Sequence, residues 1–146
     1  MQPNEMVPVT GKLRIVVRDK NGRIRANRLL KNLVVTVGKN FIAARMTATP
    51  TAMSHMGVGT SATAADVADT TLGAEAARVA LTSSSTTGNI ASYSATFPAG
   101  TGTGALTEAG IFNAASAGTL LCRTVFSVVN KGASDSMTVT WTVTVG

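Results

Sequence analysis

A glycine-rich stretch of the chain has the residue spacing of a phosphate-binding loop. Gly57, Gly59 and Ala62 follow the pattern G-x-G-x-x-A, and Glu75 comes 18 residues after the first glycine. In dinucleotide-binding folds such glycines let the backbone approach a pyrophosphate, and the later acid binds a ribose hydroxyl. That chemistry requires a buried strand before the glycines and a helix after them, inside a βαβ unit.

The sequence around these glycines does not provide that context. Residues 53–56 offer little strand, residues 61–71 have no apolar stripe, and the pattern downstream is one of antiparallel hairpins. We therefore expect the glycines to end a short strand and to open a flexible polar surface loop, residues 60–71, that is available for subunit contact. No cofactor is expected.

The other reactive side chains are isolated in the sequence. His55 is the only histidine and Cys122 the only cysteine, which excludes a histidine-pair metal site, a four-cysteine zinc site and an intrachain disulfide. Asp66, Asp69 and Glu75 could join His55 only if the fold brought them together. Cys122 lies within an apolar strand, where we expect it to act as a small buried hydrophobic residue.

The carboxylates show no pairing typical of acid–base catalysis. Glu75, Glu108 and Asp135 fall in different predicted hairpins, and Glu108 is expected to pair structurally with Arg78 or Arg123. No P-loop, G-x-S-x-G or H-E-x-x-H motif occurs. We expect no catalytic residue, no metal ligand and no small-molecule substrate, and hence a protein that is not an enzyme.

The basic residues gather in the first third of the chain. Residues 1–45 contain ten basic and two acidic residues, a net charge of +8, whereas residues 46–146 contain three basic and five acidic residues, a net charge of −2. Such asymmetry indicates an anionic partner for the basic part. The predicted contact residues are Lys12, Arg14, Arg18, Lys20, Arg23, Arg25, Arg28 and Lys31.

The partner of this basic segment is expected to be an acidic protein surface rather than nucleic acid. No aromatic residue is interleaved with the cations, as stacking on single strands would require. No helix is long and basic enough to enter a major groove. The acidic remainder of a neighbouring copy is a further possible partner.

The predicted elements are almost all strands. Residues 12–18 alternate apolar and mostly basic side chains, and Asn21-Gly22 predicts a hairpin turn after them. One short helix is expected near residues 39–46. The other predicted strands are residues 32–37, 54–59, 75–83, 89–97, 106–114, 119–129 and 137–145.

This arrangement predicts an all-β protein, an antiparallel β-sandwich or jelly-roll. Residues 1–146 are expected to form one domain, with residues 1–30 as a basic N-terminal arm or hairpin. No run approaches the roughly 18 apolar residues of a membrane span, and the first residues lack a secretory signal pattern. We expect synthesis in the cytoplasm of a host cell and no membrane association.

Four segments together resemble small structural proteins of tailed bacteriophages, described as head decoration, tail-fibre-like or collar components. The segments are KNLVVTVGKNFIAARM, MSHMGVGTSATAADVADTTLGAEAARVAL, SATFPAGTGTGALTEAGIFNAASAGTLLCRTVF and VNKGASDSMTVTWTVTV. The resemblance covers about residues 31–145. It implies a non-enzymatic, β-rich protein that assembles in copies, with no catalytic residue and no cofactor.

From this resemblance we expect a virion structural protein, with a capsid decoration or cement protein favoured. It would stabilise the head through subunit contacts, as a homo-oligomer, with a trimer the expected form, bound to the major capsid protein or to other virion proteins. Two alternatives remain open. One is a tail, collar or fibre component that touches the host surface, and the other is a basic nucleic-acid-binding protein.

Overall fold

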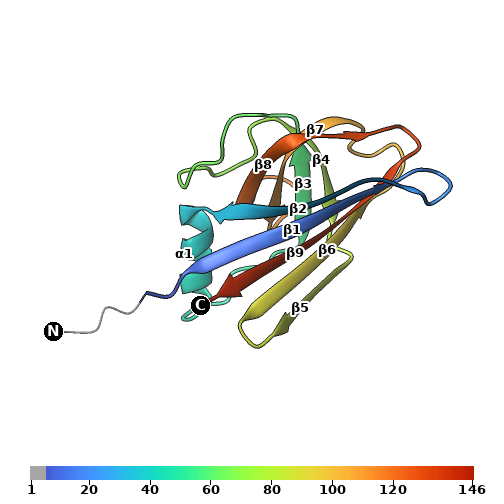
Figure 1. Ribbon diagram of the computed structural model, residues 1–146. Helices are drawn as coiled ribbons and strands as arrows, with labels where there is room; N and C mark the ends of the chain where they lie inside the picture. The colour runs from blue at the N-terminus through green and yellow to red at the C-terminus, as the bar shows by residue number, and fades with distance from the viewer. Residues whose placement is uncertain (1–5) are drawn as a thin grey trace.

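The computed structural model describes residues 6–146 as one curled antiparallel sheet with a single helix (Figure 1). The strand order is β4-β3-β7-β8-β2-β1-β9-β6-β5. The elements are β1 (Val9–Arg18), β2 (Ile24–Val34), α1 (Thr36–Ala44), β3 (His55–Gly59), β4 (Glu75–Ala80), β5 (Ser83–Thr87), β6 (Ile90–Phe97), β7 (Gly104–Phe112), β8 (Leu120–Lys131) and β9 (Ser136–Val145). The expected all-β class with one short helix is confirmed.

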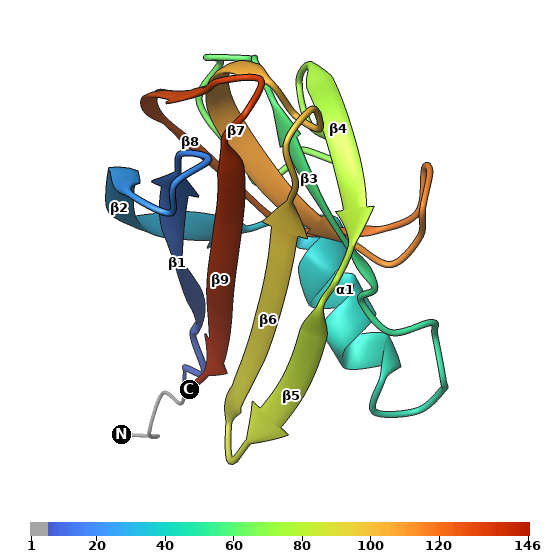
Figure 2. The same ribbon diagram turned by 90° about the vertical axis from the view of Figure 1, so that its right-hand side faces the viewer.

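The sheet folds into two layers because two segments bend from one layer to the other. Most of β2 pairs with β1, but its last residues, Leu33 and Val34, pair with Arg123 and Cys122 of β8. At the opposite corner, β4 pairs with β3 and the chain continues into β5, which pairs with β6. Figure 2 shows β4 and β5 following one another along this edge.

The space between the layers is filled by the inward side chains of both. On β9, Met137, Val139, Trp141 and Val143 are buried, while the threonines between them face outward, as the alternation predicts. Trp141 is fully buried, and its indole Nε1 donates to Asn32 Oδ1 at 2.9 Å. A Trp N–H that leaves water needs such a partner, so β2 and β9 are joined across β1.

The helix begins earlier than the sequence suggests. It spans Thr36–Ala44 rather than residues 39–46, and the predicted strand over residues 32–37 is wrong because β2 ends at Val34. Val35 N–H donates to the Leu121 carbonyl oxygen at 3.3 Å, and the chain then turns into α1. Among residues 6–146 no helix is long and apolar enough to cross a membrane.

The strand predicted over residues 75–83 is shorter, and β5 follows it. Ser83–Thr87 carries only serine and threonine, so its sequence has no apolar alternation to mark a strand. A two-residue loop joins β5 to β6, and Gly88, at its first central position, has φ +58°. Glycine tolerates this conformation, which is typical of a type II′ hairpin turn.

Candidate functional site

Glu108 anchors the loop that follows the glycine motif. It lies on β7, fully buried, and its carboxylate accepts hydrogen bonds from the backbone N–H groups of Ser61, Gly73 and Ala74 at 2.9, 2.7 and 2.7 Å. Arg123 on β8 donates to the same carboxylate at 3.1 Å. In the structure the loop between β3 and β4 spans residues 60–74, and both of its ends are thus bonded to one side chain in the outer face of the β3–β7–β8 layer.

Arg123 extends this anchor into the middle of the loop. Its guanidinium, 2 % exposed, pairs with Asp69 at 2.8 Å and donates to the carbonyl oxygens of Thr63 and Ala64. Leu72 from the loop packs into a small second core on the same face, together with Val35, Phe112 and Leu120. The loop, which the sequence predicted to be flexible, is therefore bonded to the sheet at both ends and in its middle.

The two glycines of the motif permit this close packing. A Cβ on Gly59 would overlap the Ala74 carbonyl oxygen and lie 2.6 Å from Glu108 Oε2. A Cβ on Gly57 would lie 3.1 Å from the Phe112 ring and 3.2 Å from Leu72. The glycines therefore make room for the protein's own loop. In a dinucleotide-binding fold the same glycines would make room for a pyrophosphate.

The other reactive groups are separated by this arrangement. Glu75 pairs with Arg78, Asp69 pairs with Arg123, and His55 Nδ1 is hydrogen-bonded to the hydroxyl of the adjacent Ser54. Within residues 6–146 no group of three potential metal-ligating side chains forms a site. Cys122 is fully buried, as expected, and burial raises the pKa of its thiol well above the ordinary value.

The predicted basic contact residues occupy a face of the sheet. Lys12, Arg14 and Arg18 point outward from β1, and Lys31 of β2 lies directly opposite Lys12. Leu29, opposite Arg14, is 61 % exposed on the same face. We call these five residues the basic face. Because β1 lies between β2 and β9, the basic hairpin is an integral part of the sheet rather than a separate arm.

The described part of the molecule does not neutralise the cations of the basic face. In the described part of the chain, none of the four forms an ion pair with a carboxylate. Arg14 donates to Asn27 Oδ1, and Arg18 donates to the Gly22 carbonyl oxygen. Like charges directly opposite, as at Lys12 and Lys31, are unfavourable across a strand pair, so an anionic partner would relieve repulsion there.

A hollow of about 370 Å³ lies beside the two lysines. Its lining is Thr10, Gly11, Lys12, Lys31, Thr142 and Thr144. Ammonium groups and threonine hydroxyls are donors that suit a carboxylate. The basic face can therefore accept an acidic side chain of another protein.

The remaining predicted contact residues lie outside the basic face. Arg25 pairs with Asp135 at 3.0 Å, and Arg28 donates to the carbonyl oxygens of Ser127 and Val128, so both tie β2 to the β8 end of the sheet. Lys20 and Arg23 lie at the exposed hairpin turn. Leu29 was missed by the sequence reasoning, although alternation along β2 places it with Lys31.

Asp135 closes the turn between β8 and β9. Its carboxylate accepts the Gly132 N–H at 2.7 Å as well as Arg25. The Gly132 hydrogen bond, with Arg25 and Lys131 nearby, holds the pKa of Asp135 below its ordinary value of 3.8. Lys131, 1 % exposed, donates to the Pro98 carbonyl oxygen, and burial lowers its pKa.

The depressed pKa of Asp135 predicts a contribution to stability that depends on pH. A carboxylate with a lower pKa in the folded state stabilises the fold above its unfolded-state pKa, and that contribution is lost as the pH falls through the folded-state value. We expect Asp135→Asn to destabilise the protein at neutral pH and to flatten the acid limb of its stability profile. Urea unfolding from about pH 6 to about pH 2 measures this. Parallel profiles of the variant and the wild type would contradict it.

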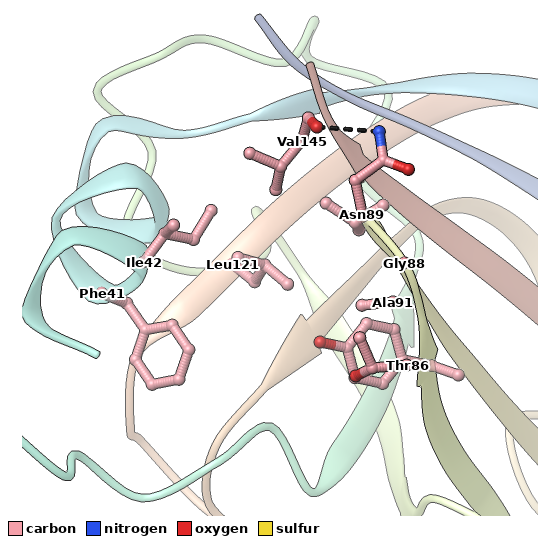
Figure 3. A pocket seen from close by; sticks show the side chains of 10 residues that line it. Phe41, Ile42, Thr86, Gly88, Asn89, Ala91, Leu121 and Val145 are labelled. Carbon is pink, nitrogen blue, oxygen red and sulfur yellow. Dashed lines mark hydrogen bonds between the residues drawn. The ribbon is translucent and has the colours of Figure 1, made fainter. Parts of the chain in front are cut away.

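A separate apolar cavity of about 360 Å³ lies between α1 and the β5–β6 hairpin. In Figure 3, Phe41 and Ile42 project from α1 toward Thr86 and Ala91, and Asn89 donates to the Val145 carbonyl oxygen at 2.9 Å. None of the described residues that line the cavity is charged, and burial raises the pKa of Tyr93 in its wall. It can hold an apolar group, but it brings together no side chains for acid–base chemistry.

No family model, curated protein or solved structure matches the chain.

Proposed function

We propose that the chain is a structural protein of a tailed-bacteriophage particle, and that it decorates the capsid by binding acidic capsid-protein surface with its basic face. The proposal rests on the sequence resemblance over residues 31–145 and on one structural observation. That observation is the exposed group of Lys12, Arg14, Arg18 and Lys31 around Leu29, with no carboxylate of the described chain paired to them.

The composition of the basic face supports a protein partner over nucleic acid. Leu29 supplies an exposed apolar side chain among the cations, a mixture typical of protein interfaces. No aromatic residue precedes Phe41 in the sequence, so the face has none on which a base could stack. Electrostatic complementarity would then guide docking, and Leu29 would lose contact with water at the centre of the interface.

The segments that carry the resemblance also have a physical task consistent with a durable structural protein. T-E-A-G contains Glu108 and Gly110, and the T-L-G-A-E segment contains Gly73 and Ala74, whose N–H groups Glu108 binds. These residues bond a loop to the outer face of the β3–β7–β8 layer. The basic face lies on the other layer, on β1 and β2. A rigid scaffold of this kind suits a protein that holds neighbouring subunits together.

Charge reversal on the basic face tests the proposal. We expect Lys12→Glu/Arg14→Glu/Lys31→Glu to abolish co-sedimentation with capsids assembled without the protein, because attraction to acidic surface becomes repulsion. Arg25 and Arg28 are left intact because they have partners within the fold. Lys20→Glu/Arg23→Glu/Lys39→Glu carries the same charge change outside the face and should retain binding.

Leu29→Ser distinguishes a protein partner from phosphate. It should weaken capsid binding and leave any salt-dependent binding to DNA unchanged. Undiminished capsid binding by the basic-face triple variant would contradict the proposal. A Leu29→Ser variant that loses DNA binding together with capsid binding would also contradict it. Imaging of particles with the chain tagged would locate it on the shell or on the tail.

A further inference from the structure

We propose that two copies of this chain join through the free edge of β5, so that the outer layers of the two molecules form one continuous antiparallel sheet. This inference is independent of the proposed function, because it concerns the isolated chain in solution. It rests on the exposure, charge and hydrogen-bond geometry of β5.

Within residues 6–146, β5 is the last strand in the sheet order and pairs only with β6. All five of its residues are exposed. Figure 2 shows the β5–β6 hairpin projecting beyond the end of β4. An edge of this kind presents a row of unpaired N–H and C=O groups, which are a template for another strand.

Although β5 is short, three other devices that protect an edge are absent from it. It contains no proline or charged residue, and its pairing with β6 shows no bulge. By contrast β4, at the other end of the strand order, carries Glu75 and Arg78. A hollow beside β5 is lined by Ser84, Ser85 and Thr86, and Arg45 is the one charged residue among its described lining residues. The Arg45 guanidinium donates to the Pro50 carbonyl oxygen.

The charge distribution argues that the partner is a second copy. The chain carries a net charge of +6, so two copies repel each other in most relative orientations. No charged residue occurs between Arg78 and Glu108, which makes the β5–β6 hairpin a neutral surface. Within its layer, β5 is separated from the basic strands β1 and β2 by β6 and β9. Two copies can therefore approach at β5 with little repulsion.

The register of the pair follows from the hairpin turn. A two-residue loop makes Thr87 and Ile90 a hydrogen-bonded pair, and the alternation of an antiparallel ladder then directs the N–H groups of Ser83, Ser85 and Thr87 toward β6. The N–H groups of Ser84 and Thr86 point to the free edge. Pairing centred on Ser85 uses both of them in each copy and forms four backbone hydrogen bonds.

This register is compatible with the side chains. Ser85 of each copy lies opposite Ser85 of the other in a non-hydrogen-bonded pair, where Cα atoms are about 4.5 Å apart. Small hydroxyl side chains fit that spacing without a clash or a charge conflict. The arrangement is self-complementary about a twofold axis and closes as a dimer, which differs from the trimer expected from the sequence.

Disulfide formation at position 85 is the direct test. About 4.5 Å between Cα atoms lies within the range that a disulfide spans, and the native Cys122 is fully buried. We expect Ser85→Cys to form a covalent dimer under mild oxidation at micromolar concentration. Thr140→Cys, an exposed position on the same face of β9, should stay monomeric. Equal cross-linking of the two variants, or none at position 85, would overturn the proposal.

Sedimentation of variants that block the edge is the second test. Thr86→Pro removes an N–H that the hairpin itself does not use, and Ser85→Lys places two like charges face to face. Each should weaken dimerisation of the full chain by about tenfold or more, with unchanged far-UV circular dichroism, while Thr140→Lys should not. A wild-type monomer, or a trimer insensitive to the two edge variants, would overturn the proposal.

Discussion

Glu108→Gln is expected to lower the free energy of unfolding by about 3–5 kcal/mol, the usual cost of breaking a buried ion pair by removing one partner. Glu108 is fully buried and Arg123 is 2 % exposed, so although Arg123 keeps Asp69, water cannot replace the carboxylate that it loses. The glutamine amide also presents a donor to backbone N–H groups that need an acceptor. Both effects act on the same loop.

Glu75→Gln is the matched control for this prediction. It makes the same chemical change in a carboxylate that pairs with Arg78 but is 29 % exposed. Arg78 is 9 % exposed but keeps its hydrogen bonds to the Ala114 and Ala117 carbonyl oxygens, so the control should lose less than Glu108→Gln. Urea unfolding gives both values. Equal losses in the two variants would contradict an anchoring role for Glu108.

Amide hydrogen exchange separates loss of the loop anchor from general destabilisation. In Glu108→Gln the amides of Gly73 and Ala74 should exchange faster through local opening, because their acceptor is changed. The amides of β9, on the other layer, should change only as global stability does.

Gly38→Ala is expected to destabilise the protein by about 1–3 kcal/mol, the usual cost of overpacking a core. In an ordinary helix interior the same change is favourable by about 0.5–1 kcal/mol. Here a Cβ would overlap the Leu121 carbonyl oxygen and lie 2.8 Å from its carbonyl carbon. Because these are backbone atoms of β8, which is paired on both sides, the helix has to move away.

Asn40→Ala tests whether the effect belongs to the helix or to its contact with β8. Asn40 is exposed in α1, so the substitution changes helix propensity without touching Leu121. We expect its stability to lie within about 0.5 kcal/mol of the wild type. Thermal unfolding of both variants measures the difference. A stabilised Gly38→Ala variant would show that α1 can shift on the sheet without cost.

Local patterns in the sequence determined the class of the fold and much of its element order. The alternation in β9, the Asn21-Gly22 turn and the outward basic residues of β1 follow from the two-residue period of a strand and from the freedom of glycine at positive φ. These signals need no knowledge of distant partners. The same period places Leu29 on the face of Lys31, although Leu29 was not predicted as a contact residue.

Only the tertiary structure decided what the chemically suggestive residues do. The glycine motif admits the protein's own loop because Glu108, far along the chain, binds that loop's N–H groups. Arg25 and Arg28 are occupied by partners about a hundred residues away. The β5 strand exists because β6 pairs with it, not because serine and threonine alternate. Such pairings depend on which segments meet in space, and the periodicity of a single segment carries no information about that.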